Sequence, residues 1–269
     1  MPARSPQHGA DPLQWLGSVR AAAPPGGPFE QNWAELAAHC PLEGLDKPGL
    51  GRHRVRVRLE LGPGQTVYMK LYRGRQLGLA GWEAQLLTHL RAAGVPAACP
   101  LGWGTIRREA VPTAFLATQE VPGDGLDRWL SREGAGLKAS QRAGLVVLSA
   151  AMLAGMHAAG VYHRDAYLCH LFVDRAPDGT LRLAWIDLAR GLLAPWRVWR
   201  WSVKDAAAML HSSRSVGCVS DRDRLRWLAA YGRFRGWSGR RLRRWARAVV
   251  QRSGRMAVHD ARRAARGLA

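Results

Sequence analysis

Charged and apolar residues alternate strictly over residues 54–61, which run Arg-Val-Arg-Val-Arg-Leu-Glu-Leu. A period of two is typical of a strand with one buried face. Residues 62–65, Gly-Pro-Gly-Gln, are typical of a turn, and the alternation resumes over 66–72. The pattern therefore predicts a β-hairpin that places Lys70 in the middle of its second strand, where a lysine is usually a solvated edge residue.

The period changes to that of a helix after the hairpin. Apolar residues recur at helical spacing over 76–93, and Gly94 and Pro96 follow. Glu83 lies next to this apolar stripe rather than opposite it. An apolar strand is predicted over 114–121, because Pro-Gly-Asp-Gly follows it directly.

A stretch without any Asp, Glu, Lys or Arg runs from Ala143 to Tyr162. Its twenty residues are long enough to span a bilayer. Nine of these residues are Ala or Gly, however, and the stretch contains Ser149 and His157. We therefore expect a buried core helix, which begins at about Ser140.

Strands dominate the early part of the chain and helices the late part. Short strands are predicted over 171–173 and 181–186, and the pattern is helical from about Lys204 onward. This order predicts an α+β, two-lobed fold with a small β-rich N-lobe and a helical C-lobe. The predicted divisions are a leader over 1–45 with a helix at 31–40, an N-lobe over 46–121, and a C-lobe over 122–269.

The charge indicates an acidic partner. Lys and Arg number 40 against 20 Asp and Glu in 269 residues, which gives a net charge of +20. Such an excess fits nucleic acid, anionic lipid or a phosphorylated substrate. No nucleic-acid recognition motif accompanies it. The four cysteines have no metal-ligand or redox spacing, and residues 1–23 contain no apolar signal region, so a cytoplasmic protein is expected.

Much of this charge lies in the last 49 residues, which contain fifteen Arg and three Asp, a net +12. Residues 240–250 place Leu242, Trp245 and Val249 on one helical face and arginines on the rest, which predicts a basic amphipathic helix. Its basic face is either solvated or attracted to anionic lipid or substrate phosphates. In the second case the protein would lie peripherally on the inner face of the inner membrane.

The densest polar cluster begins at His163-Arg164-Asp165, and Ile186-Asp187 follows after an apolar strand. His-Arg-Asp, a strand and a further Asp form the layout of a kinase catalytic loop and metal-binding aspartate. Phosphoryl transfer requires one carboxylate at the attacking hydroxyl and another that holds Mg²⁺ on the ATP phosphates. Asp165 and Asp187 are the candidates for these two roles.

Further residues fit the same layout. Lys70 could reach the α- and β-phosphates, and Glu83 could pair with it. Glu120 and Val121 would lie at the hinge whose backbone bonds adenine, and Asp205 could support the catalytic loop from below. Gly49 and Gly51, followed by Arg-His-Arg, could form either a remnant of a Gly-rich phosphate loop or an ordinary turn, since a third glycine is missing.

The stretch from His163 to His170 resembles the catalytic loop of the lipopolysaccharide core kinases, the Kdo/heptose kinase family. Further similar segments span roughly residues 50–235, and four of them are Ala93-Gly94-Val95-Pro96, Pro100-Leu101-Gly102-Trp103-Gly104, Ile186-Asp187-Leu188-Ala189-Arg190 and Arg200-Trp201-Ser202-Val203-Lys204-Asp205. The resemblance implies a protein-kinase-like fold. It also implies ATP-dependent phosphorylation of a sugar hydroxyl, heptose or Kdo, on the lipid-linked core oligosaccharide.

The resemblance also implies residue roles. Asp165 would be the base, Lys70 the phosphate-binding lysine, Glu83 its partner and Asp187 the Mg²⁺ ligand. His170 would either contact metal or phosphate or form a structural hydrogen bond, because Mg²⁺ prefers oxygen ligands. Leu188-Ala189 replaces the Phe-Gly of protein kinases, which suggests that no activation-loop switch operates.

Two alternatives stay open at this point. One is a kinase-like phosphotransferase that acts on a soluble small molecule or on protein. The other is a catalytically inactive kinase fold that serves as a scaffold. The joint presence of Lys70, Glu83, Asp165 and Asp187 argues against the scaffold, which has no physical need for all four.

Overall fold

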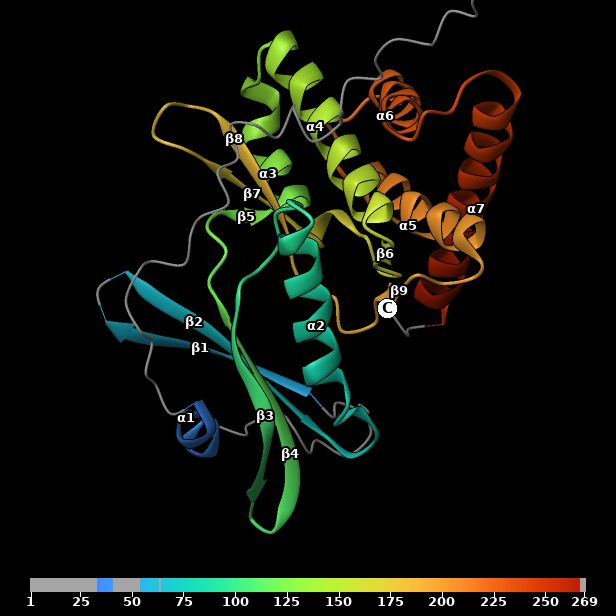
Figure 1. The fold of residues 1–269 in the computed structure, drawn as a ribbon. Helices are drawn as coiled ribbons and strands as arrows, with labels where there is room; N and C mark the ends of the chain where they lie inside the picture. The colour runs from blue at the N-terminus through green and yellow to red at the C-terminus, as the bar shows by residue number, and fades with distance from the viewer. Residues whose placement is uncertain (1–32, 41–53, 63, 267–269) are drawn as a thin grey trace, which may run out of the picture.

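A computed structural model of the chain describes residues 33–40, 54–62 and 64–266. The described part has the predicted α+β, two-lobed form, with an antiparallel sheet on one side and a group of helices on the other (Figure 1). The leader falls mostly outside the described residues, as do Gly49 and Gly51. The predicted division between residues 121 and 122 falls in the segment between β4 and β5.

The N-lobe is built around a four-stranded antiparallel sheet in the order β1-β2-β4-β3. Helix α2 packs against this sheet, and α1 packs against β3. The elements are α1 (Trp33–His39), β1 (Arg54–Gly62), β2 (Gln65–Arg73), α2 (Leu79–Ala92), β3 (Pro100–Arg108) and β4 (Val111–Gln119).

The position of β2 corrects the interpretation of Lys70 as a solvated edge residue. Strand β2 pairs with β1 on one side and with β4 on the other, so it lies inside the sheet. The side chain of Lys70 is buried as a result, and the residue is only 7% exposed. A buried lysine requires compensating charge, so its partners decide what it does.

Strand β3 was missing from the predicted elements. Gly102 and Gly104 interrupt its sequence, and glycine is depleted in strands. The structure explains the first glycine, because a Cβ at Gly102 would collide with the ring of Trp33. Helix α1 can therefore pack closely on β3 at this point.

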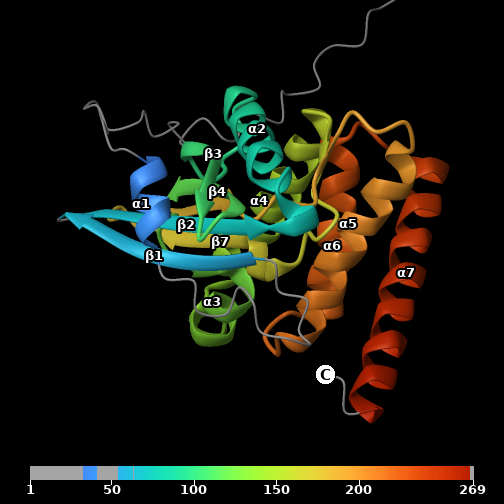
Figure 2. The same ribbon diagram turned by 90° about the horizontal axis from the view of Figure 1, so that it is seen from below.

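The C-lobe consists of five helices in the described chain (Figure 2) and of two small antiparallel sheets, one of three strands and one of two. The helices are α3 (Leu126–Glu133), α4 (Ala139–Ala158), α5 (Val198–Ser212), α6 (Asp221–Phe234) and α7 (Gly239–Ala265). The strands are β5 (Asp124–Gly125), β6 (Val161–Tyr162), β7 (Leu171–Arg175), β8 (Leu181–Trp185) and β9 (Leu192–Leu193).

Helix α4 is the uncharged stretch noted in the sequence. By length and composition alone it could cross a membrane, and half of its most apolar window is buried inside the protein. It packs against α6 and β8, and Leu153 and Met156 on it are fully buried. These contacts confirm the prediction of a core helix.

Helices α5 and α7 lie side by side in both ribbon views. Trp245 of α7 is fully buried, and its indole N–H donates to the hydroxyl of Ser202 at 3.3 Å. Val249 is buried too, whereas Arg243 and Arg244 are exposed. The predicted amphipathic helix therefore packs its apolar side on the lobe and presents arginines outward.

Candidate active site

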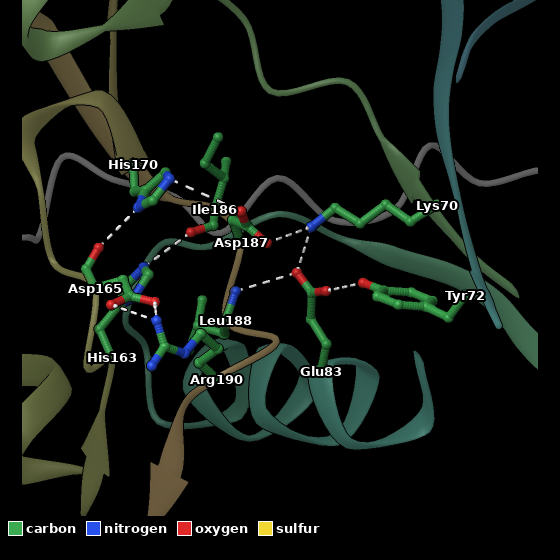
Figure 3. Close-up of polar contacts among 10 residues, drawn as sticks. All are labelled: Lys70, Tyr72, Glu83, His163, Asp165, His170, Ile186, Asp187, Leu188 and Arg190. Atoms are coloured by element: carbon green, nitrogen blue, oxygen red, sulfur yellow. Dashed lines mark hydrogen bonds and ion pairs between the residues drawn. The ribbon is translucent and has the colours of Figure 1, made fainter. Parts of the chain in front are cut away.

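Lys70 reaches from β2 to two carboxylates that come from different parts of the chain (Figure 3). Its Nζ lies 2.6 Å from Oε1 of Glu83 on α2 and 3.1 Å from Oδ1 of Asp187. The structure thus brings together three residues that the sequence separates by up to 117 positions. The pair of carboxylates supplies the charge that a buried ammonium group requires.

Glu83 is fully buried, and its carboxylate accepts three hydrogen bonds. Besides Lys70, the hydroxyl of Tyr72 donates to Oε2 at 2.8 Å and the backbone N–H of Leu188 donates to Oε1 at 3.1 Å. Glu83 therefore links β2 of the N-lobe to the segment that follows Asp187. Its place beside the apolar stripe of α2 directs it inward, toward this junction.

Asp165 lies in the loop between β6 and β7, and two cations contact its carboxylate. Nη1 of Arg190 lies 3.0 Å from Oδ2, and Nζ of Lys204 lies 3.5 Å from Oδ1. Lys204 also donates to the carbonyl oxygen of Arg164. Burial lowers the pKa of Lys204, although the charge of Asp165 acts in the opposite direction.

Asp205 on α5 fixes the loop from below, as the sequence suggested. Its buried carboxylate accepts the backbone N–H of His163 at 2.8 Å and that of Arg164 at 2.7 Å. His157 lies 3.2 Å from the same carboxylate through Nε2, and its Nδ1 lies 2.7 Å from the hydroxyl of Tyr231. Because Asp205 can only accept, Nε2–H donates to it and Nδ1 accepts from Tyr231.

Two site residues have left-handed backbone, with φ of 69° at Arg164 and 59° at Asp187. Non-glycine residues in this region cost about 1–3 kcal/mol each and persist where the surroundings hold them. Asp205 holds Arg164 through its amide, and Lys70 holds the Asp187 side chain. The strain therefore lies at Asp187 itself and at Arg164, the residue directly before Asp165.

His170 connects the two carboxylate segments. Its Nδ1–H donates to the carbonyl of Asp165 at 2.7 Å, and its Nε2 lies 3.8 Å from Oδ2 of Asp187. Burial favours the neutral ring, but hydrogen bonds and the charge of Asp187 raise the pKa of His170 to about 9. The side chain of His170 therefore forms a structural hydrogen bond and also approaches Asp187, the candidate metal ligand.

A cleft of about 340 Å³ is lined by Glu83 and His170 among the residues described above. Its walls include Lys70 and Asp187 at one end and Thr118, Val121 and Ile186 near the inter-lobe segment. Within the described part of the chain, no three His, Cys, Asp or Glu side chains cluster in a way that could hold a metal. Mg²⁺ needs only one or two carboxylates when nucleotide phosphates supply further oxygens, so Asp187 fits that ion.

The two predicted hinge residues differ in position. Val121 lines the cleft. The backbone N–H of Glu120 already donates to the carbonyl of Thr66 at 2.9 Å, and its carboxylate accepts from Arg58 at 3.1 Å. The backbone N–H of Glu120 is therefore occupied within the sheet, and a contact between its backbone and adenine stays a prediction.

Comparison with known proteins decides the family. The sequence profile of the lipopolysaccharide kinase (Kdo/WaaP) family matches residues 64–231. The lipopolysaccharide core heptose(I) kinase WaaP of Pseudomonas aeruginosa is 32% identical over 206 residues, which cover 68% of this chain and 74% of that protein. The chain belongs to the lipopolysaccharide kinase (Kdo/WaaP) family. This confirms the resemblance noted in the sequence.

Two further relatives agree with this placement. The Escherichia coli heptose(I) kinase WaaP is 36% identical over 90 residues, which cover 32% of this chain and 34% of that protein. A solved structure described as WaaP in complex with acyl carrier protein is 28% identical, with a TM-score of 0.60, and covers 77% of this chain and 85% of its own. This lipopolysaccharide kinase is therefore an ATP-dependent enzyme with a kinase-like fold that phosphorylates a sugar hydroxyl.

The sequence analysis did not identify three residues of this site, Tyr72, Arg190 and Lys204. Tyr72 was placed only within the predicted strand at 66–72. Arg190 and Lys204 were noted only as members of segments that resemble the family. Each reaches its carboxylate across 11 to 39 positions. Sequence spacing gave no signal for such contacts, because the fold alone brings these residues together.

Proposed function

We propose that this kinase transfers the γ-phosphoryl group of ATP to a hydroxyl of an inner-core heptose on a lipid-linked oligosaccharide. The observation that supports the chemistry is the bridge from Lys70 to Glu83 and Asp187, beside the loop that holds Asp165. The choice of heptose over Kdo rests on the named activity of the Pseudomonas aeruginosa relative.

In the proposed reaction, Lys70 binds the α- and β-phosphates and Glu83 keeps its side chain extended. Asp165 accepts the proton of the acceptor hydroxyl, whose oxygen forms a bond to the γ-phosphorus while the bond to the β-phosphate oxygen breaks. Arg190 is 60% exposed, so its side chain can leave Asp165 when the acceptor enters. Bound Mg²⁺, held by Asp187 with His170 nearby, would neutralise charge on the phosphates.

Adenine would lie against the inter-lobe segment near Thr118 and Val121, which line the cleft. Gly49 and Gly51 remain proposed phosphate-loop residues and lie outside the described residues. The hydrogen bonds from Asp205 orient the loop before substrate arrives, which is the preorganisation that transfer between positioned groups requires.

The proposed site of action is the cytoplasmic face of the inner membrane, because the acceptor is lipid-linked. Two features support peripheral contact with an anionic surface. The arginines of the first turns of α7 are exposed, namely Arg240, Arg241, Arg243, Arg244 and Arg247. Trp196 is 85% exposed, Val198 beside it is also exposed, and Trp199 lies below the guanidinium group of Arg244 at 5.7 Å.

The test of the function is direct. Purified protein is incubated with ATP and, in separate reactions, with an acceptor that ends in heptose or with one that carries Kdo alone. The masses of the products are measured by mass spectrometry. We expect one added phosphate on the heptose-containing acceptor only. Phosphorylation of the Kdo-only acceptor would overturn the choice of sugar, and no transfer to either would overturn the proposed function.

A further inference from the structure

Lys204 reaches Asp165 from outside the catalytic loop, across 39 positions of the chain. It lies on α5 directly before Asp205, whose carboxylate holds the amides of His163 and Arg164. Its Nζ lies 3.5 Å from Oδ1 of Asp165, and it also donates to the carbonyl oxygen of Arg164. The contact between α5 and the loop therefore fixes the ammonium group beside the candidate base.

The loop itself carries no lysine or arginine after the candidate base. Residues 166–169 are Ala-Tyr-Leu-Cys. His170, which follows, directs its two ring nitrogens at the carbonyl of Asp165 and at Asp187. Phosphoryl transfer spreads negative charge over the oxygens of the transferred group, and positioned cations at these oxygens lower the barrier. A lysine or arginine that acts on the acceptor side has to come from another element.

The two cations on Asp165 differ in how firmly they are held. The side chain of Arg190 is 60% exposed, whereas that of Lys204 is 22% exposed and bonded to the carbonyl of Arg164. We therefore expect an entering acceptor to displace Arg190 and to leave Lys204 in place. An ammonium group has three N–H donors. Arg164 and Asp165 take two of them, and the third has no acceptor in the part of the chain that the structure describes.

The charge beside Lys204 changes during the reaction of the proposed function. Asp165 is an anion before transfer and balances the ammonium group. It becomes neutral when it takes the proton of the acceptor hydroxyl, while the acceptor oxygen bonds to the γ-phosphorus and the bond to the β-phosphate oxygen breaks. Asp205 cannot take over the balance, because its carboxylate is occupied by two backbone amides and His157.

The transferred group is the anion that can replace Asp165. A hydroxyl oxygen within hydrogen-bond reach of Oδ1 lies no more than about 7 Å from Nζ of Lys204. The oxygens of the phosphoryl group that bonds to this hydroxyl can therefore approach the unused N–H donor. The resulting contact strengthens as the proton leaves the acceptor, so it favours the transition state over the bound substrates.

We propose that Lys204 is a further catalytic residue of this kinase, whose ammonium group donates a hydrogen bond to the transferring γ-phosphoryl group. This inference rests on the proposed function. Because the contact is made in the transition state, loss of Lys204 should lower kcat and leave the KM for ATP and for the acceptor nearly unchanged.

The kinetic test uses three replacements of Lys204. Lys204→Met should lower kcat about 100-fold, the usual effect of removing one positioned donor from a developing charge. Lys204→Gln keeps an N–H donor for the carbonyl of Arg164 but has no charge, so it should be as slow as Lys204→Met. Lys204→Arg keeps the charge and should lose less than about tenfold. Lys138→Met is the matched control, because Lys138 is an exposed lysine just before α4.

A binding test needs neither turnover nor the acceptor sugar. Aluminium fluoride with Mg-ADP mimics the phosphoryl group in the transition state, and calorimetry measures how much it tightens the binding of Mg-ADP. We expect a tightening of about 100-fold for the wild-type protein and for Lys138→Met. Lys204→Met and Lys204→Gln should lose most of it, while their Kd for Mg-ADP alone should stay unchanged.

Three results would overturn the inference. One is a kcat of Lys204→Met within about threefold of the wild-type value. Another is a wild-type kcat for Lys204→Gln, which would make Lys204 only a structural donor to Arg164. The third is a wild-type protein whose binding of Mg-ADP does not respond to aluminium fluoride. If no acceptor is phosphorylated but the response to aluminium fluoride depends on Lys204, the proposed acceptor is wrong and the role of Lys204 stands.

Discussion

Replacement of Glu83 should destabilise the protein more than replacement of any exposed Asp or Glu does. Glu83→Ala removes the acceptor of three donors at once: the ammonium group of Lys70, the hydroxyl of Tyr72 and the N–H of Leu188. Removal of one partner from a buried ion pair costs about 3–5 kcal/mol. Lys70 keeps Asp187 at 3.1 Å, so the lower end of this range applies.

The two remaining donors add to this cost. A buried donor left without a partner costs about 1–3 kcal/mol, so the hydroxyl and the amide together contribute at least about 2 kcal/mol. We therefore expect Glu83→Ala to lower the free energy of unfolding by about 5 kcal/mol. Because domains are stable by only about 5–15 kcal/mol, this variant should be close to unfolding.

The measurement is urea denaturation, followed by fluorescence at low temperature. Glu83→Gln keeps the size and one acceptor oxygen, so it should fold and lose only about 1–2 kcal/mol. Glu133→Ala is the matched control, because Glu133 is an exposed glutamate on α3 and should leave the midpoint unchanged. A loss below about 1 kcal/mol for Glu83→Ala would refute the reasoning about three buried donors.

Lys70 and Glu83 should also behave as one unit. In a double-mutant cycle of Lys70→Met and Glu83→Gln, the double variant should be more stable than the sum of the single losses predicts, by about 2 kcal/mol. The rate losses should be far from additive too, because either change alone disrupts the same phosphate-binding group. Strictly additive losses in both measurements would mean that the pair does not act jointly.

The remaining predictions concern the base, the pH dependence and the membrane. Asp165→Asn should keep the fold and ATP binding but lower turnover about 100-fold or more, and near wild-type turnover would contradict its role. Burial lowers the pKa of His157 and of His163, so the unfolded chain binds more protons. The contribution of these two histidines should therefore be complete above about pH 6.5 and fall by up to about 1.4 kcal/mol per pH unit and histidine as the pH drops. The raised pKa of His170 acts in the opposite direction, and its contribution is lost as the pH rises from about 6.5 through about 9. The test is therefore made on the acidic side, where a denaturation midpoint that stays flat between about pH 6 and about pH 5 would contradict the prediction. Glutamine in place of the five exposed α7 arginines should weaken salt-dependent sedimentation with anionic vesicles, since each contributes about 1 kcal/mol near such a surface; if the wild type does not sediment, the membrane proposal is wrong. The residues are Arg240, Arg241, Arg243, Arg244 and Arg247.

Local periodicity predicted much of this fold, because strands and helices with one buried face repeat at 2.0 and 3.6 residues. The hairpin of β1 and β2, the helix α4 and the buried side of α7 follow from that rule. Strand β3 does not, because glycine is depleted in strands, and Gly102 allows close packing against Trp33 of α1 while Gly104 lies against Phe115 of β4. The start of α5 at Val198 also differs from the expected Lys204, since the aromatic residues before Lys204 mask the helical period.

The candidate site was predictable in its residue types but not in its contacts. The order Lys70, Glu83, Asp165 and Asp187 is a pattern along one chain, and the structure brings three of these residues into direct contact. The burial of Lys70 depends on β4 pairing with β2, which is a non-local contact. The occupied amide of Glu120 depends on Thr66, 54 positions earlier in the chain, so no local pattern could show it.

The start of the catalytic loop is fixed by Asp205, which lies outside the loop. Ala166 and Tyr167 follow Asp165, and Arg164 has a strained left-handed backbone. The loop's geometry is fixed instead by a buried carboxylate on α5 that accepts two consecutive amides and is itself bonded to His157. This anchor lies outside the loop, so it holds the amides of His163 and Arg164 without help from the residues after Asp165. Lys204, next to the anchor, supplies a positive charge that contacts Asp165.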